Sequence, residues 1–158
     1  MRAAQRGDPL AMDALLTDLA PWVGRLCSSI VLEGGEDAMQ ETLIAVLRNL
    51  PTLREPAALR GWVRRIAVRQ SLRMAGDTRV VLLSEPPESS AVVDLDTAID
   101  VRDTLAKLSP LQRAVLVLRH LEDLSERETA ETLGVPEGTV KSGLHRARER
   151  FRERWKEE

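Results

Sequence analysis

Apolar residues recur at helical spacing in two blocks of this chain, and a segment without that period separates the blocks. The first block covers about residues 8–74 and begins at Asp8-Pro9, a pair typical of a helix cap followed by proline at the first helical position. Gly34-Gly35 and Pro51 interrupt the block. Between these breaks, apolar residues three or four positions apart predict one face of a helix. They are Met39, Leu43, Val46, Leu47 and Leu50.

The opposite side of that predicted helix carries a second, polar stripe. Its members are Asp37, Gln40, Glu41, Ile44 and Arg48. Acidic and polar residues at this spacing are typical of a solvated surface, and they are equally consistent with a face that docks a partner helix. The periodicity alone leaves both interpretations open.

A further helix is predicted from Glu55-Pro56 to about Arg73, and its polar side is uniformly basic. Its apolar face consists of Leu59, Trp62, Val63, Ile66 and Ala67, and its basic residues are Arg60, Arg64, Arg65, Arg69 and Arg73, without any acid. Uncompensated charge along one helix favours contact with solvent or phosphate, so nucleic-acid binding is a credible role. Trp62 fits a core anchor better than a base-stacking residue.

The segment from about residue 75 to 95 contains Pro86-Pro87 and Ser89-Ser90 and has no helical period. Such composition is typical of a linker. Between Ser84 and Asp100 its charged residues are all acidic, and they are Glu85, Glu88, Asp94, Asp96 and Asp100. We interpret the segment as a solvated acidic linker, although the apolar run at residues 80–83 could also dock on a neighbouring surface.

The second block carries the signals of a helix-turn-helix. Ser109 and Ser125 each begin a capping-box pattern, and Gly134 is suited to a left-handed helix end. A small residue at Ala130, the glycine at the turn and a branched residue at Val140 match the needs of two helices in close contact. The sequence therefore predicts a DNA-binding module within about residues 97–158.

The second helix of this module separates by face. Val140, Leu144, Ala147 and Phe151 are predicted to point inward, and Lys141, Ser142, His145, Arg146 and Arg148 are left outside. Such a helix enters the major groove, where basic and hydroxyl side chains read base edges. The arginines from Arg150 onward alternate with glutamates and are expected to be solvated and internally paired.

The cysteine content, the hydropathy and the motifs of the chain exclude several classes of function. Cys27 is the single cysteine and is expected to be a small buried hydrophobe, so no internal disulfide can form. No run of about 18 apolar residues predicts a membrane span, and the default compartment is the cytoplasm. The pattern contains no nucleophile–base pair, metal cluster or phosphate loop. We therefore expect no enzymatic activity, no catalytic residues, no cofactor and no metal.

Three stretches in this order resemble the extracytoplasmic-function (ECF) sigma factors of bacterial RNA polymerase. They are RAAQRGDPLAMDALL, EDAMQETLIAVLRNLPTLREPAALRGWVRRIA and LSPLQRAVLVLRHLEDLSERETAETLGVPEGTVKSGLHRARERFRE. The resemblance implies an all-α fold with two helical domains joined by a flexible acidic linker. The expected divisions are a sigma region 2-like domain at 1–75, a linker at 76–96 and a sigma region 4-like helix-turn-helix domain at 97–158.

The resemblance also implies roles for the surfaces described above. The polar stripe containing Gln40 and Glu41 would dock on the coiled-coil clamp of core RNA polymerase. The loop at 51–56 and the following helix would recognise and melt the −10 promoter element, and the second helix of the helix-turn-helix would read the −35 element. The implied −10 residues are Arg54, Arg60, Trp62, Arg64, Arg65, Arg69 and Arg73. The implied −35 residues are Thr139, Lys141, Ser142, His145, Arg146 and Arg148.

Two departures from the family pattern bear on promoter reading. Arg69 lies near a position where asparagine is common, and Gly143 stands where arginine is frequent. Gly143 either lets the DNA backbone approach closely or weakens −35 reading. An anti-sigma factor is an expected further partner. The alternatives are a stand-alone helix-turn-helix transcriptional regulator and a sigma-like interaction protein without promoter function.

Overall fold

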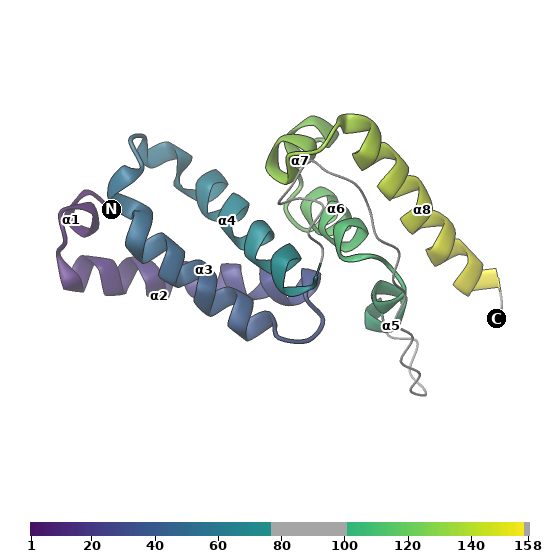
Figure 1. Ribbon diagram of the computed structural model, residues 1–158, viewed down its shortest axis with the longest axis horizontal. Helices are drawn as coiled ribbons and strands as arrows, with labels where there is room; N and C mark the ends of the chain where they lie inside the picture. The colour runs from purple at the N-terminus through teal and green to yellow at the C-terminus, as the bar shows by residue number, and fades with distance from the viewer. Residues whose placement is uncertain (77–100, 157–158) are drawn as a thin grey trace.

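The computed structural model describes residues 1–76 and 101–156, and every regular element within these two ranges is a helix. The all-helical prediction is therefore confirmed. The predicted linker lies, apart from Gly76, outside the described residues. The helices are α1 (Arg2–Gln5), α2 (Pro9–Ile30), α3 (Gly35–Asn49), α4 (Leu59–Met74), α5 (Val101–Ala106), α6 (Pro110–His120), α7 (Glu126–Leu133) and α8 (Glu137–Lys156), with 3₁₀ turns η1 (Leu50–Thr52) and η2 (Pro56–Ala58) (Figure 1).

The predicted helix boundaries have the expected local chemistry. The Asp8 side chain accepts a hydrogen bond from the Ala11 amide at 3.0 Å. Ser109 and Ser125 both form complete capping boxes, with their side chains accepting from the third helical amide and a glutamine or glutamate reaching back. Gly134 ends α7 in the left-handed conformation, with φ of 67°. These boundaries form as predicted because each depends on a few adjacent residues.

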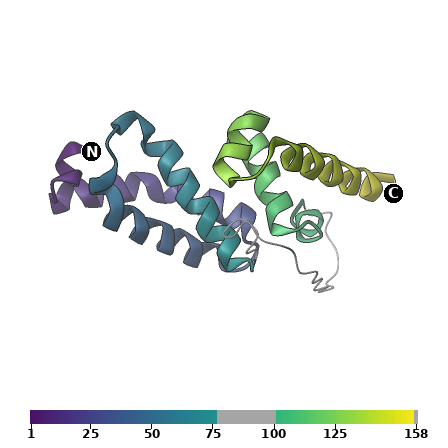
Figure 2. The same ribbon diagram turned by 45° about the horizontal axis from the view of Figure 1, so that its top comes forward.

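Helices α2, α3 and α4 form the first half of the molecule, and they pack along much of their lengths (Figures 1 and 2). Its core includes Val23, Leu26, Ile30 and Val63, all with no exposed surface. The junction of α2 and α3 is especially close. A Cβ atom placed on Gly35 would lie only 2.7 Å from the Ser28 Cα. Only glycine fits there without moving one of the two helices.

The predicted apolar stripe of α3 is partly wrong. Leu47 is 47% exposed, whereas Ala38 and Thr42 are fully buried. The buried positions 38, 42 and 46 follow one another by four residues and face α2 and α4. Thr42 is tolerated there because its hydroxyl donates a hydrogen bond to the Ala38 carbonyl at 2.7 Å. The face of α4 is also rotated from the prediction, with Val68 and Leu72 buried and Ile66 only partly so.

Helices α5 to α8 form the second half around α6 (Figure 2). Val140, Leu144 and Ala147 of α8 are buried, as predicted from their spacing. The side chain of Phe151 lies outside the part of the chain described. Ala130 and Leu133 of α7 complete the contact between the helices of the helix-turn-helix.

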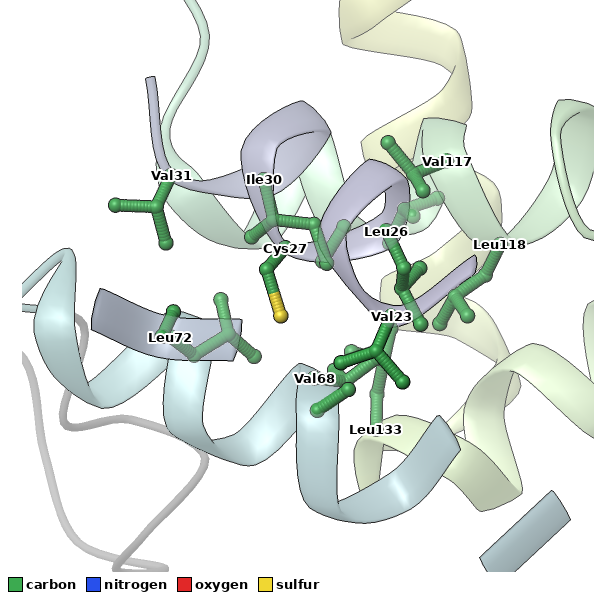
Figure 3. Packing of buried hydrophobic residues seen from close by; sticks show 14 of the residues in the cluster. Val23, Leu26, Cys27, Ile30, Val31, Val68, Leu72, Val117, Leu118 and Leu133 are labelled. Atoms are coloured by element: carbon green, nitrogen blue, oxygen red, sulfur yellow. The ribbon is translucent and has the colours of Figure 1, made fainter. Parts of the chain in front are cut away.

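The two halves share one continuous apolar cluster. Leu26 of α2 and Val68 of α4 belong to the same cluster as Leu118 of α6 and Leu133 of α7 (Figure 3). The buried guanidinium of Arg113 in α6 adds a polar link, donating from Nε to the Ile30 carbonyl at 2.8 Å. Helices α2 and α4 thus lie directly against α6 and α7.

Candidate nucleic-acid interface

The polar stripe of α3 is a solvent-facing surface. Its five predicted residues are all exposed, and they are Asp37, Gln40, Glu41, Ile44 and Arg48. Leu47 joins Ile44 on this side, and the two are 47% and 38% exposed. Sequence reasoning missed Leu47 by assigning it to the core. The surface therefore combines acidic residues with an exposed apolar pair.

The basic row of α4 is also solvent-facing, with one exception. Arg60, Arg65, Arg69 and Arg73 are exposed. The exception is Arg64, whose side chain is 17% exposed and whose Nε donates to Glu122 Oε2 at 2.8 Å. Sequence spacing could not reveal this partner, because 58 residues separate the two positions. Arg65, Arg69 and Arg73 thus face solvent, Arg60 is exposed but has its guanidinium carbon 4.7 Å from the centroid of the Trp22 ring, and Arg64 is paired within the molecule.

The loop before α4 is fixed by the N-terminal helix. Gln5 of α1 donates from Nε2 to the carbonyls of Leu50 and Leu53, at 3.2 and 2.6 Å. The next residue, Arg54, is exposed. Gln5 was not among the predicted functional residues, and no local pattern would have indicated it. Its role is to hold the loop that presents Arg54 beside α4.

Trp62 is half-buried and packs against the apolar cluster. This placement favours the core-anchor interpretation, since much of the ring is already covered. Figure 3 shows the neighbouring part of that cluster, where side chains of α2 and α4 gather around Val23 and Val68.

The outward face of α8 carries most of the residues that were predicted to contact the −35 element. Lys141, Ser142, His145, Arg146 and Arg148 are exposed, and Thr139 is half-buried. The Ser142 hydroxyl donates to the Thr139 carbonyl at 3.1 Å, and Lys141 Nζ lies 4.0 Å from Glu126. Among the described residues, Arg146 and Arg148 form no ion pair. Their charge is therefore available to DNA phosphate.

Gly143 faces the interior edge of α8 rather than its exposed row. A Cβ atom there would lie 3.6 Å from a methyl group of Val115 in α6, which is ordinary van der Waals contact. The first atoms of any side chain at this position would therefore lie against α6. The expectation that Gly143 removes a DNA-contacting arginine gains no support from this geometry.

Hydrogen bonds and burial shift the pKa values of Glu128 and Cys27. At the start of α7, hydrogen bonds from the Ser125 side chain and amide hold the pKa of Glu128 below its usual value. Burial raises the pKa of the Cys27 thiol, and the nearby hydroxyl groups of Ser71 and Thr42 oppose that rise. A thiol that stays protonated and covered is a poor nucleophile, so the prediction of a structural cysteine is confirmed by its burial.

The residues that the structure describes contain no group of three or more histidine, cysteine, aspartate or glutamate residues able to hold a metal ion. No helix among them is long and apolar enough to span a membrane.

Two family models match the two halves of the molecule. Sigma-70 region 2 matches residues 15–79, which include most of α2 and all of α3 and α4. Sigma-70 region 4 matches residues 98–151, from before α5 into α8. The fold and the helix-turn-helix therefore define a transcription initiation factor of the sigma-70 class.

Proteins of similar sequence show to which group of sigma factors the chain belongs. The ECF RNA polymerase sigma factor SigM of Mycobacterium tuberculosis is 33% identical over 151 residues, covering 92% of this chain and 77% of SigM. The ECF RNA polymerase sigma factor SigW of Bacillus subtilis is 26% identical over 174 residues, covering 96% and 92% of the two chains. The chain belongs to the ECF sigma factors, and its functions are to bind core RNA polymerase and to direct promoter recognition.

Solved structures share the fold. The structure of CnrH in complex with the cytosolic domain of CnrY has a TM-score of 0.65 at 21% identity, and the match covers 99% of this chain and 95% of that chain. The sigma factor RpoE of Bartonella quintana, in complex with the anti-sigma factor NepR, has a TM-score of 0.62 at 24% identity and covers 91% and 96%.

Proposed function

We propose that this sigma factor divides its work among three surfaces: the α3 face docks on core polymerase, α4 with its preceding loop engages the −10 element, and α8 reads the −35 element. The observation that carries the proposal is the arrangement within the region 2 match. There an acidic and apolar docking face and a row of mostly exposed arginines lie on two helices that pack directly on each other. One rigid unit would thus place polymerase and DNA side by side.

The α3 face suits a helical partner with complementary charge. Glu41 and Asp37 supply negative charge, Ile44 and Leu47 supply apolar surface, and Gln40 can donate and accept hydrogen bonds. The family resemblance implies that this partner is the coiled-coil clamp of the polymerase's largest subunit. Because α3 is packed on both α2 and α4, the face is held in a fixed orientation.

The α4 surface suits single-stranded DNA at the −10 element. Arg60, Arg65, Arg69 and Arg73 present positive charge along one helix, and Arg54 adds charge from the adjoining loop. Opening of the duplex would be favoured if this surface binds the separated strand better than the duplex. Trp62 would act here chiefly by anchoring α4 to its core.

The α8 surface suits the major groove of the −35 element. Lys141, Ser142 and His145 come early in the helix, where base edges are reached, and Arg146 and Arg148 follow toward the backbone phosphates. The buried Val140 and Leu144 fix the rotation of α8, so these five side chains face outward together.

The cytoplasm is the proposed compartment, since that is where core polymerase and promoter DNA lie. An anti-sigma factor is a proposed regulatory partner, because the sigma factor RpoE, which has the same fold, was solved in complex with the anti-sigma factor NepR. We propose no catalytic activity for the chain itself.

Reconstituted transcription tests the proposal. The wild-type protein, added to bacterial core polymerase, should give transcripts from specific promoters of its own genome. Glu41→Lys should abolish core binding while circular dichroism remains unchanged, because it reverses charge on the docking face. Asp18→Lys is the matched control, since it makes the same charge change at an exposed position of α2. Equal core affinity of the Glu41→Lys and wild-type proteins would refute the α3 assignment.

A stand-alone helix-turn-helix regulator is the alternative function. It would bind duplex DNA without polymerase, and charge reversal on α3 would not affect it. The match of region 2 over residues 15–79 favours the sigma-factor role, because a regulator of that kind does not need the α3 surface. Sequence-specific duplex binding in the absence of core, with no promoter-specific transcript in its presence, would favour the alternative.

A further inference from the structure

The loop between α6 and α7 places one carboxylate against both α2 and α4. Glu122 Oε1 accepts a hydrogen bond from the Trp22 indole Nε1 at 2.8 Å. Its second oxygen, Oε2, accepts from Arg64 Nε, also at 2.8 Å. Both oxygens of a region 4 side chain are therefore bound by region 2 side chains, one of which belongs to the proposed −10 surface.

The loop that carries Glu122 is firmly held. The Glu122 amide donates to the Val117 carbonyl at 3.1 Å, and the Leu124 amide donates to the Leu118 carbonyl at 3.0 Å. Asp123 between them has a positive φ of 54°, and the Arg119 guanidinium donates to the Leu124 carbonyl. The carboxylate is thus pre-positioned by its own backbone, so little ordering entropy is lost when it binds Arg64.

The pair lies in a sheltered position. The side chains of Arg64 and Glu122 are only 17% and 8% exposed. Arg60 lies with its guanidinium carbon 4.7 Å from the centroid of the Trp22 ring, so a second basic residue of α4 gathers at the same place. By contrast, the ion pair between Arg127 and Glu131 on α7 is 78% and 62% exposed. Salt screens the exposed pair far more than the sheltered one.

The surrounding contacts join the same two halves. Leu26 of α2 and Leu118 of α6 lie in the apolar cluster shared by the halves (Figure 3). Arg113 of α6 adds its hydrogen bond to the Ile30 carbonyl at the end of α2. We call this arrangement, in which Glu122 holds Trp22 and Arg64, the closed state.

We propose that the Glu122 carboxylate occupies on Arg64 the place of a DNA phosphate, so that the closed state and the promoter-bound state compete for one guanidinium. The proposal rests on the proposed function, which assigns Arg64 to the −10 surface. Carboxylate and phosphate oxygens accept from the same guanidinium donors in the same planar geometry. Arg64 cannot give its sheltered Nε to both. In the closed state the α3 docking face and the outer face of α8 remain exposed. Glu122 therefore competes with DNA only on α4, where it binds Arg64.

The competition has a quantitative consequence. If only the open fraction of the protein can engage promoter DNA through Arg64, the apparent dissociation constant equals the intrinsic constant divided by that fraction. Weakening the Glu122 contacts therefore should lower the concentration of sigma factor needed for half-maximal promoter complex. The fold-decrease in this half-maximal concentration should equal the fold-increase in the ratio of open to closed protein.

Thiol labelling measures that ratio. In a Cys27→Ala background, Val117→Cys places a reporter on α6 at a position 7% exposed within the shared cluster. Its labelling rate follows the open population when closure is faster than labelling. Glu122→Gln removes the charge and Trp22→Phe removes the indole donor. Each should raise the rate by roughly tenfold or more, the range expected for losing a hydrogen bond to a charged group.

Glu131→Gln is the matched control, because it removes one glutamate charge from an exposed pair of the same half. If neither Glu122→Gln nor Trp22→Phe labels more than twofold faster than this control, Glu122 does not hold the closed state. Two variants are used because a local packing defect could by itself speed labelling in one of them, but the same defect is not expected in both.

Promoter titration tests the competition itself. With core polymerase present, Glu122→Gln should shift the half-saturating sigma concentration downward by the factor seen in labelling, and Glu131→Gln should leave it in place. If Glu122→Gln labels faster but its half-saturating sigma concentration is unchanged, the proposal that Glu122 and DNA compete for Arg64 is wrong. Absence of any promoter-specific transcript from the wild-type protein would instead overturn the proposed function, whatever the labelling rates.

Discussion

Gly35 offers a sharp test of how α3 is positioned. A Cβ atom at this residue would lie 2.6 Å from Ser28 Oγ, 2.7 Å from Ser28 Cα and 3.0 Å from Ser28 Cβ. Since a backbone atom is among these neighbours, rotation of the Ser28 side chain cannot relieve the overlap. Gly35→Ala must therefore push α3 away from α2. Overpacking of this kind costs about 1–3 kcal/mol of folding free energy.

A glycine-to-alanine substitution at Gly61 should instead increase the stability of the protein. A Cβ atom at Gly61, near the start of α4, would meet no atom within 4 Å. Gly61→Ala should stabilise the protein by about 0.5–1 kcal/mol through better helix propensity. For a chain of this size, 1 kcal/mol corresponds to about 2–4 °C in Tm. We expect Gly35→Ala to lower Tm by about 2–12 °C and Gly61→Ala to raise it by about 1–4 °C.

Thermal unfolding followed by circular dichroism measures both shifts under one set of conditions. Because α3 carries the proposed docking face, Gly35→Ala should also weaken core binding below the melting range, and pull-down with core polymerase measures that loss. A Gly35→Ala protein that melts at or above the wild-type temperature would show that the α2–α3 approach is looser than these distances indicate. The reasoning would then fail for the position of the docking face as well.

Three further predictions concern the second half. Arg146→Ala should weaken binding to −35 duplex DNA and reduce the slope of log affinity against log salt by about one, as measured by fluorescence anisotropy; an unchanged slope would exclude a phosphate contact. Ser125→Ala should lower the free energy of unfolding by about 1 kcal/mol in urea titrations, because it removes the cap of α7, and an unchanged midpoint would refute that role. Gly143→Ala should stabilise α8 by up to about 1 kcal/mol without changing −35 affinity, since the added methyl group meets Val115 at ordinary contact distance. A gain in −35 affinity for Gly143→Arg over Gly143→Ala would contradict this placement of residue 143.

The closed state changes how the basic residues of α4 are interpreted. Along the sequence, Arg64 and Arg65 look equivalent, since both belong to one arginine-rich helix. In the folded chain Arg65 is exposed, whereas Arg64 is sheltered by Glu122. A substitution at Arg64 is therefore expected to affect both closure and promoter binding, and one at Arg65 only the latter.

Several features were determined by the sequence because they depend on short-range chemistry. Ser109 and Ser125 cap their helices through residues three positions away, and Gly134 ends α7 through its own backbone freedom. The rotation of α8 was also predictable, since Val140, Leu144 and Ala147 recur at helical spacing and have one apolar side to bury. These local patterns were sufficient for the all-helical fold and for the outward face of α8.

Other features were decided only by the tertiary structure, because they depend on which distant elements meet. The burial of Thr42 and the exposure of Leu47 follow from how α2 and α4 together cover α3; hydrophobicity alone placed Leu47 in the core and gave no indication that Thr42 is buried. Gln5 beneath the loop at residues 50–53 and Glu122 against Trp22 and Arg64 join residues 45 to 100 positions apart. The spacing of apolar and polar residues along the sequence does not predict such pairings. The partner of a side chain across a helix–helix contact depends on how the whole helices pack.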